Sequence, residues 1–279
     1  MKTLTREYAL VIYKSIVLAL RYLQSHCSPG VACKIQNIFV ALHRSKIKYS
    51  YDKKKGLYVA SELGIVRYFG DMCRGFDFYA RSIKKRGSAL AASYCLSHIE
   101  FAKDDLVIDC GANYGDLNLY LEDKIEKFNY IAIEPGPVEY QCLLNSIPEA
   151  RVFNLGLSNS DGELDFYLCS KSGDSSLVEP KHYTDKVKVS VKTLDSLAND
   201  LKITRCRLLK LEAEGWEPEI LDGAKEFIKV CDYVAIDGGL ERGVYEEATF
   251  PAVNNFLMRN GFEMIDIYGP AYRALYKKK

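Results

Sequence analysis

Asp109 is the first residue whose type and position favour cofactor binding. It follows the apolar run Leu106-Val107-Ile108 and opens the segment Cys110-Gly111-Ala112-Asn113-Tyr114-Gly115-Asp116. Glycines let a backbone approach a ligand closely and adopt φ values that side chains forbid. A helix predicted to begin near Asp116 would present unpaired N–H groups to the same ligand. This strand, turn and helix predict a site for a nucleotide-like cofactor.

Glu134 is a second acidic residue at the end of an apolar strand. It follows Tyr130-Ile131-Ala132-Ile133 and precedes Pro135-Gly136-Pro137. A carboxylate in this position can accept hydrogen bonds from both hydroxyl groups of an adenosine ribose, as in the dinucleotide-binding folds. The prolines end the strand and hold this acceptor at the crevice.

Short strands and helices alternate from residue 104 onward, and this order positions the two acids. Strands are predicted at 106–110, 130–134, 151–155, 207–212, 232–237, 262–268 and 271–276, with helices near 115–126, 137–146, 194–200, 217–229 and 246–260. Two further β segments, 163–168 and 186–192, flank a loop rich in Ser, Gly and Asp. The alternation predicts an α/β domain with a mostly parallel sheet, helices on both faces, and a ligand outside the carboxyl ends of the strands.

The first hundred residues have a different pattern. We expect an amphipathic helix over 4–25, a break at Ser28-Pro29-Gly30, and a β-hairpin whose strands 47–52 and 57–60 flank Lys53-Lys54-Lys55-Gly56. A helix is predicted over 75–99, where Tyr79, Ile83, Leu90, Tyr94 and Ile99 form an apolar stripe. The sequence therefore predicts an N-terminal extension, 1–100, and a second domain, 101–279.

The charge is unevenly distributed between these regions. Residues 1–55 hold 11 Lys and Arg against 2 Asp and Glu, whereas the remainder holds 27 against 35. A basic front can bind an anionic membrane surface, dock on the acidic domain, or simply be solvated; we do not expect a nucleic-acid partner. No run is long and apolar enough to span a bilayer. The nine cysteines lack C-x-x-C and zinc spacing, which favours a reducing cytoplasm over a disulfide framework or a metal site, with peripheral membrane contact left open.

Four segments together resemble a known family. Asp109 to Gly115 with Ile133-Glu134-Pro135 is similar to the S-adenosylmethionine site of class I methyltransferases. Three further segments narrow the resemblance to FkbM-like methyltransferases: Asn154-Leu155-Gly156-Leu157-Ser158-Asn159-Ser160-Asp161-Gly162-Glu163, Val191-Lys192-Thr193-Leu194-Asp195, and Leu209-Lys210-Leu211-Glu212-Ala213-Glu214-Gly215 leading into Glu219-Ile220-Leu221-Asp222-Gly223-Ala224. The resemblance implies a Rossmann-like fold with a seven-stranded sheet and O-methylation. The acceptor we expect is a sugar or glycan hydroxyl.

The resemblance also implies the cofactor site. Its members are Asp109, Gly111, Ala112, Asn113, Gly115, Asp116, Glu134, Pro135, Leu157, Ser158 and Glu212. Glu134 is expected to bind the ribose and Asp109 to hold the methionine end, to which the glycine turn gives room and backbone partners. The family usually has Asp where this chain has Glu212, so the carboxylate is kept but reaches one methylene further.

A hydroxyl acceptor needs a general base, which typically adds about 10²–10⁴-fold to the rate. The candidates are Glu212 and Glu214 at the end of the strand 207–212, Asp237 at the end of the strand 232–237, and His182 in the Ser/Gly-rich loop 170–185, which would act as a lid. Glu214 has a simpler alternative function, capping the helix that follows it. Glu212 and Asp237 could instead share a magnesium ion, although the sequence does not require a metal.

Two other classes of function compete with methyl transfer. An NAD-dependent sugar oxidoreductase or epimerase also uses a glycine turn, but its fingerprint is G-x-G-x-x-G, and here the glycines fall as G-x-x-x-G. A non-catalytic, membrane-docked protein that binds the cofactor is the third alternative.

Overall fold

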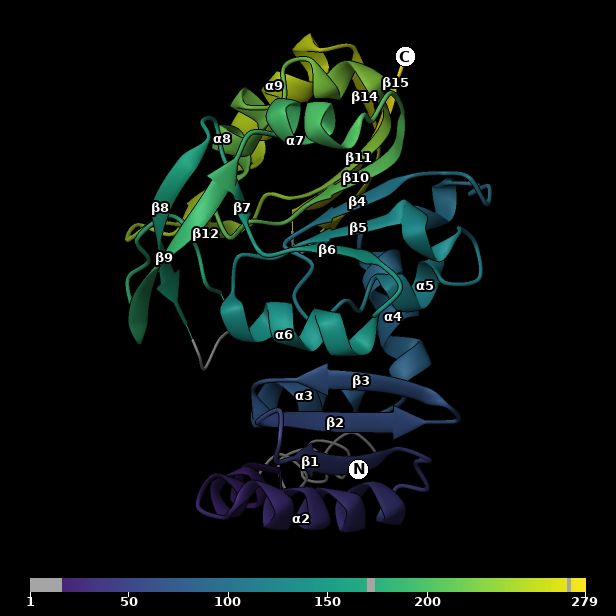
Figure 1. The fold of residues 1–279 in the computed structure, drawn as a ribbon, viewed down its shortest axis with the longest axis vertical. Helices are drawn as coiled ribbons and strands as arrows, with labels where there is room; N and C mark the ends of the chain where they lie inside the picture. Colours follow the sequence, from purple (N-terminus) through teal and green to yellow (C-terminus); the bar gives the residue numbers. More distant parts are fainter. Residues whose placement is uncertain (1–16, 170–173, 270–271) are drawn as a thin grey trace, which may run out of the picture. The chain divides into compact units, whose positions relative to one another are not determined.

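The computed structural model describes residues 17–169, 174–269 and 272–279. The chain forms two compact units, residues 1–83 and 84–279 (Figure 1). The sequence placed this boundary after residue 100. The difference arises because the helix α4, Ile83–Ser93, packs on the large sheet of the second unit, where Ala91 and Tyr94 belong to the core.

The first unit contains a three-stranded antiparallel sheet. Its strands are β1 (Lys48–Asp52), β2 (Leu57–Glu62) and β3 (Ile65–Phe69), in the order β1-β2-β3, accompanied by the helices α2 (Pro29–Leu42) and α3 (Met72–Tyr79). The predicted hairpin is confirmed, with Leu57 opposite Asp52. The break predicted at Ser28-Pro29-Gly30 exists but lies at residues 26–28. Pro29 already starts α2, because a proline without its N–H is well suited to the first turn of a helix. Of the helix predicted at 4–25, residues 17–25 are helical and 4–16 lie outside the described residues.

The single helix predicted at 75–99 is divided in the structure. It becomes the end of α3, then α4, and a 3₁₀ turn at Leu96–His98. Asp71 caps α3 by accepting a hydrogen bond from the Arg74 N–H at 2.8 Å. The apolar stripe was nevertheless informative, since Tyr79, Ile83 and Tyr94 are fully buried.

The second unit is built on a seven-stranded sheet in the order β14-β15-β11-β10-β4-β5-β6. The bounds are β4 Val107–Cys110, β5 Tyr130–Ile133, β6 Arg151–Phe153, β10 Cys206–Leu211, β11 Cys231–Asp237, β14 Phe262–Tyr268 and β15 Arg273–Lys278. The strands β4, β5, β6, β10 and β11 are parallel, while β15 is antiparallel to both β11 and β14. The predicted mostly parallel sheet is confirmed.

Helices cover both faces of this sheet, because buried parallel strands present apolar side chains in both directions. On one face, Val107, Tyr130 and Leu208 pack with α4, α5 (Asn118–Leu121) and α6 (Pro137–Ser146). On the other, Ile108, Ile131 and Leu209 pack with α7 (Leu194–Leu201), α8 (Glu217–Asp222) and α9 (Phe250–Arg259) (Figure 1).

Several helices are shorter than the sequence suggested. The helix predicted at 115–126 is the single turn α5, and that at 217–229 is α8 followed by a 3₁₀ turn at Phe227–Val230. A small ribbon, β12 (Leu240–Arg242) with β13 (Glu247–Ala248), precedes α9. A second small sheet, in the order β7-β9-β8, joins Gly156–Leu157, Asp185–Lys192 and Gly162–Leu168. Among the helices that the structure describes, none is long and apolar enough to cross a membrane.

Candidate functional site

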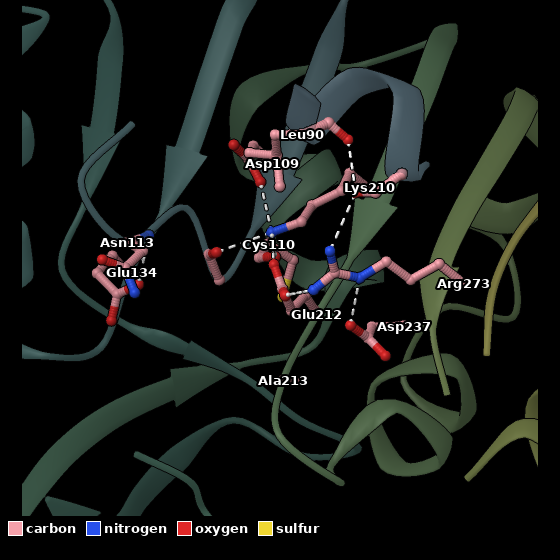
Figure 2. Close-up of polar contacts among 12 residues, drawn as sticks. Leu90, Asp109, Cys110, Asn113, Glu134, Lys210, Glu212, Ala213, Asp237 and Arg273 are labelled. Atoms are coloured by element: carbon pink, nitrogen blue, oxygen red, sulfur yellow. Dashed lines mark hydrogen bonds and ion pairs between the residues drawn. The ribbon is translucent and has the colours of Figure 1, made fainter. Parts of the chain in front are cut away.

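The candidate site lies at the carboxyl edge of the parallel strands. The strands β4, β5, β10 and β11 end there, so Glu134, Glu212 and Asp237 meet at one edge. Because β15 runs the other way, it begins at this edge, and its first residue Arg273 is the register partner of Asp237. Figure 2 shows the resulting row of alternating charges, with Lys210 between Asp109 and Glu212 and with Arg273 between Glu212 and Asp237.

Lys210 is the buried cation at the centre of this row, with 2% of its surface exposed. Its Nζ lies 3.0 Å from Asp109 Oδ1 and 2.7 Å from Glu212 Oε2. It also donates to the carbonyl oxygens of Cys110 at 3.1 Å and Gly111 at 2.8 Å. Burial alone would lower the pKa of Lys210, but Asp109 and Glu212 raise it, so the side chain stays charged. The sequence analysis assigned Lys210 no function, although a lysine inside an apolar strand was a signal that could have revealed it.

Asp109 is held by the protein on both oxygens. Lys210 pairs with Oδ1 at 3.0 Å, and the Tyr130 hydroxyl donates to Oδ2. Burial raises the pKa of Asp109, against the lowering effect of Lys210 and Tyr130. The structure therefore gives Asp109 a definite position, while its contact with a cofactor stays a prediction.

Arg273 links two of the three acids predicted as general bases, Glu212 and Asp237. Its guanidinium lies 2.9 Å from Glu212 Oε1 and 2.6 Å from Asp237 Oδ2, and it donates to Ser93 Oγ at 3.0 Å. Tyr94 supports the guanidinium from its ring face, with its centroid 4.8 Å from Cζ. Sequence reasoning missed Arg273 because only the reversed direction of β15 brings it here.

The surroundings of Arg273 give Glu212 and Asp237 pKa values that are shifted in opposite directions. Burial alone would raise the pKa of Glu212, but Lys210 and Arg273 outweigh it and hold the pKa at about 2. For Asp237, burial and the charge of Glu212 raise the pKa, although Arg273 opposes them. The guanidinium also occupies the position between the two carboxylates that a shared magnesium ion would need. Within the described parts of the chain, no three acidic, His or Cys side chains gather as a metal site.

The N–H groups of the glycine turn bind the protein itself. Gly111 and Ala112 both donate to the carbonyl of Ile133, at 3.0 and 3.1 Å, and the Asn113 N–H donates to Glu134 Oε2 at 2.8 Å. The helix expected to start near Asp116 begins at Asn118 and has one turn. Of the N–H groups expected to face a ligand, those of Gly111, Ala112, Asn113 and Gly115 thus donate to the protein itself.

The two glycines of this turn serve close packing. Gly111 has φ +69°, and a Cβ there would lie 1.9 Å from the Glu212 carbonyl oxygen. Gly115 has φ +81°, and its Cβ would lie 2.9 Å from Leu143 Cδ2 on α6. Asn113, at φ +51°, differs from both. Its side-chain Oδ1 is buried without a hydrogen-bond partner among the described residues, which leaves an acceptor for a ligand.

Glu134 is buried but retains hydrogen-bonding capacity. Its Oε1 accepts from the Gly136 N–H and its Oε2 from the Asn113 N–H, both at 2.8 Å. An ionised carboxylate offers about four acceptor positions, so one position remains on each oxygen. Burial and the nearby Glu139 raise the pKa of Glu134 to about 7, against these N–H groups. Pro135 is tied to the next strand by the Asn154 side chain, which donates to its carbonyl at 3.1 Å.

Three other residues implied for the cofactor site have structural contacts. Asp116 is buried and binds the Arg86 guanidinium at 2.9 Å. Leu157 belongs to the core. Ser158 is fully buried; its N–H donates to the Lys192 carbonyl at 2.9 Å, and its hydroxyl accepts from the Trp216 indole at 3.4 Å. Their contacts with a cofactor stay predictions.

Glu214 and His182 differ in their surroundings. His182 is exposed, and only its backbone carbonyl has a described contact, with the Cys169 thiol. Glu214 has φ +49°, and its carbonyl accepts from Ser176 Oγ at 2.8 Å. Burial and the charge of Glu241 raise the pKa of the Glu214 carboxyl well above its usual range. Glu241 was not predicted from the sequence; it lies on the small strand β12, two residues after Gly238-Gly239.

Glu217, at the start of α8, shapes the loop that carries Glu214. It is fully buried, and its Oε1 accepts from the N–H groups of Ala213 at 2.7 Å and Gly215 at 3.3 Å. Its Oε2 accepts from the Thr249 hydroxyl at 2.9 Å. The capping function that the sequence offered for Glu214 is wrong, because the N-cap of α8 is Trp216. Glu217 binds N–H groups of the loop before the helix, and the Glu214 carboxyl is left for other chemistry.

Replacing Lys210 by methionine should destabilise the second unit. The change leaves Asp109 buried without its cation and Glu212 with Arg273 as its only one, and removing one partner of a buried ion pair typically costs about 3–5 kcal/mol. Since loss of the cation raises both carboxyl pKa values, the deficit should be full at pH 8 and shrink as the pH falls and the carboxyls take up protons. Urea unfolding at several pH values measures it. Lys229→Met, which breaks an exposed pair with Glu226, is the control, and an equal effect of both variants would contradict the central position of Lys210.

The comparisons with known proteins agree with this geometry. A family model described as "Methyltransferase FkbM domain" matches residues 109–264. The chain is 25% identical over 154 residues to Methyltransferase 1 of Beauveria bassiana (strain ARSEF 2860), an alignment covering 46% of this chain and 62% of the relative. It is 28% identical over 169 residues to Methyltransferase sdnD of Sordaria araneosa, covering 48% and 65%. The chain therefore spans less than two thirds of the length of these two relatives.

A third relative is the 2-O-methyltransferase NoeI of Sinorhizobium fredii (strain NBRC 101917 / NGR234), 23% identical over 176 residues that cover 56% of this chain and 72% of the relative. The family match runs from Asp109 at the end of β4 to Met264 in β14, and so includes Glu134, Lys210 and Glu212. Because the match covers more than half of the sequence, the chain belongs to the FkbM family of S-adenosylmethionine-dependent methyltransferases.

Proposed function

We propose that this chain transfers the methyl group of S-adenosylmethionine to a sugar hydroxyl of a glycan or glycosylated intermediate. The observation that carries the proposal is the place of the Glu214 carboxyl, which follows the carboxyl end of β10 and neighbours Glu241 of β12; burial and the charge of Glu241 also raise its pKa. A hydroxyl acceptor, unlike an already charged nucleophile, needs a base of this kind. The printed name of the relative NoeI, a 2-O-methyltransferase, is consistent with an oxygen acceptor.

The residues of the cofactor site fit S-adenosylmethionine. Glu134 keeps one acceptor position on each oxygen, which matches the two hydroxyl groups of a ribose. The unpartnered Oδ1 of Asn113 lies in the turn after β4, where it can accept from the methionine ammonium. When bound, the cofactor supplies a methyl group already activated by the sulfonium. The protein must then align the acceptor, which contributes about 7–11 kcal/mol in favourable cases.

Glu214 is the best general base among the four predicted residues. Glu212, with a pKa near 2, is a weak base, and Asp237 is bound to Arg273 and to the Gly239 N–H. Glu241 hydrogen bonds to Glu214, and burial with three neighbouring acids raises the pKa of Glu241 to about 8. Two carboxyls in contact share one proton at neutral pH. Once the shared proton has been lost, Glu214 would accept the proton of the acceptor hydroxyl, whose oxygen would receive the methyl group that the bound cofactor supplies.

The first test is methyl transfer itself. Methyl-labelled S-adenosylmethionine is offered with a panel of oligosaccharides and glycan extracts, and acid hydrolysis followed by mass spectrometry identifies O-methyl sugars. Label confined to protein, nucleic acid or lipid would overturn the sugar proposal while leaving the methyltransferase assignment intact.

Cofactor binding should depend on the protonation of Glu134. A protonated carboxyl cannot accept from both ribose hydroxyls, so binding should weaken as the pH falls through 7, by about tenfold between pH 8 and pH 6. Calorimetric titration with S-adenosylhomocysteine in buffers of different ionisation enthalpy measures affinity and proton release together. Glu134→Gln should lose roughly 1.5–3 kcal/mol of binding and the pH dependence. Glu139→Gln should shift the dependence to lower pH, since Glu139 raises the Glu134 pKa; a flat wild-type profile argues against ribose binding by Glu134.

The pH profile of turnover should report the Glu214–Glu241 pair. The rate should rise with pH as the shared proton is lost near pH 8, the value to which the Glu241 pKa is raised. Glu214→Gln should lower kcat by about 10²–10⁴-fold. Glu241→Gln should keep turnover but move the rise to lower pH, because it removes the charge that raises the Glu214 pKa. A rise that stays in place in Glu241→Gln excludes this pair as the base.

We also propose that Arg273 makes a divalent ion unnecessary. Its guanidinium supplies positive charge to both Glu212 and Asp237, so chelator should leave wild-type turnover unchanged. Arg273→Ala should lose turnover and gain calorimetrically detectable Mg²⁺ or Mn²⁺ binding at the two freed carboxylates. Arg207→Ala, which breaks pairs with Asp232 and Asp105 on the same sheet, is the control. Loss of wild-type turnover on chelation would restore the metal alternative.

A further inference from the structure

The helix α2 presents apolar residues on two opposite faces. Ala32, Cys33, Gln36 and Val40 are buried against the first unit. Val31, Ile38 and Leu42 recur at helical spacing on the other side, and Ile38 and Leu42 are 65% and 77% exposed. A surface helix normally has one apolar stripe that faces its own core. The second stripe of α2 therefore needs a separate explanation.

The neighbouring helical residues 17–25 repeat this feature. Leu18 and Tyr22, one turn apart, are 65% and 66% exposed, and Leu23 is also exposed. The two helices adjoin, because the buried Gln24 side chain donates to Gln36 at 3.0 Å. Large exposed apolar groups gathered on one element mark interaction surfaces. We call Leu18, Tyr22, Val31, Ile38 and Leu42 the apolar stripe.

Basic side chains accompany the stripe. Lys34 lies within it on α2, and Arg44, Lys46 and Lys48 follow directly after the helix; all four are exposed. In the described part of the chain, none of these four has a carboxylate within ion-pair distance.

The acidic side chains described in the first unit already have hydrogen-bond or ion-pair partners within that unit. Between residues 17 and 83 there are 11 Lys and Arg but only 4 Asp and Glu, an excess of 7 positive charges. Asp52 accepts from its hairpin turn, Glu62 from Ser82 and Ile83, Asp71 from Arg74, and Asp77 pairs with Arg21. The field of this unit toward solvent is therefore strongly positive.

We propose that the apolar stripe and these basic residues bind the surface of an anionic lipid bilayer. Aliphatic and aromatic side chains beside lysines are the composition of helices that lie in a membrane interface, and each basic residue adds attraction to anionic headgroups. A second copy fits less well, since two such units repel each other. A nucleic acid would use the lysines but leave Ile38 and Leu42 without a partner. This inference is independent of the proposed acceptor.

Vesicle co-sedimentation of the full chain tests the proposal. The vesicles are phosphatidylcholine alone or phosphatidylcholine mixed with phosphatidylglycerol, at low and high salt. We expect sedimentation with the anionic vesicles that salt weakens, and little with the neutral ones. Ile38→Asp with Leu42→Asp, and separately Lys34→Glu with Lys46→Glu, should each weaken partitioning by at least about tenfold. These positions are exposed, and circular dichroism with urea unfolding of each variant verifies that the first unit stays folded.

Met258→Asp and Arg259→Glu are matched controls, because both residues are exposed on α9 of the second unit. They should partition like the wild type. The proposal is overturned if the wild type does not bind anionic vesicles, or if the stripe variants bind as well as the controls. It is also overturned if light scattering shows a dimer that Ile38→Asp with Leu42→Asp dissociates, since a second copy would then cover the stripe.

Discussion

The buried ammonium of Lys210 is the constraint on which the site depends. A charge that is 2% exposed must be paired and hydrogen bonded, and Lys210 meets this need with Asp109, Glu212 and the carbonyls of Cys110 and Gly111. These partners belong to the ends of two adjacent strands, β4 and β10, and to the turn that follows β4. One cation therefore fixes the turn after β4 against the end of β10, and Gly111 allows the approach because a side chain would strike the Glu212 carbonyl.

The row of charges also determines which carboxyl groups of the site are ionised and which have a raised pKa. Between Lys210 and Arg273, Glu212 is held ionised, with a pKa near 2. Farther along the loop, burial and the charge of Glu241 raise the pKa of Glu214, and burial and the charges of other neighbouring acids raise the pKa of Glu241. When their surroundings push the pKa values of neighbouring acids apart, those acids can have different functions in one site. Ionised Glu212 can provide fixed negative charge, whereas the pair with raised pKa values is suited to exchange a proton near neutral pH.

The sequence predicted the site residues that a local strand-and-turn pattern reveals. It did not predict residues that reach the site only through the pairing of strands far apart in the chain. Asp109 and Glu134 were found because each ends an apolar strand before a turn. Arg273 could not be found in this way, since it reaches the site only because β15 runs antiparallel to β11. The predicted lengths of helices were wrong where tertiary contacts end a helix early. At α5, for example, turn hydrogen bonds replace the longer helix that was expected. The start of α2 was misread because Pro29 breaks helices in their interior but favours their first turn.

The geometry of the sheet gives a physical reason for glutamate at position 212, where the resemblance to FkbM-like methyltransferases implies aspartate. In the strand order, β11 lies between β10 and β15, so the carboxylate that follows β10 must reach across the end of β11 to meet Arg273. The additional methylene lets one carboxylate contact Lys210 at 2.7 Å with one oxygen and Arg273 at 2.9 Å with the other. The long side chain of Arg273 covers the remaining distance between β15 and Glu212, and it also binds Asp237 on β11, the strand between them. Glu212 and Arg273 are thus matched in length, and the departure from the family pattern is a part of the charged row itself.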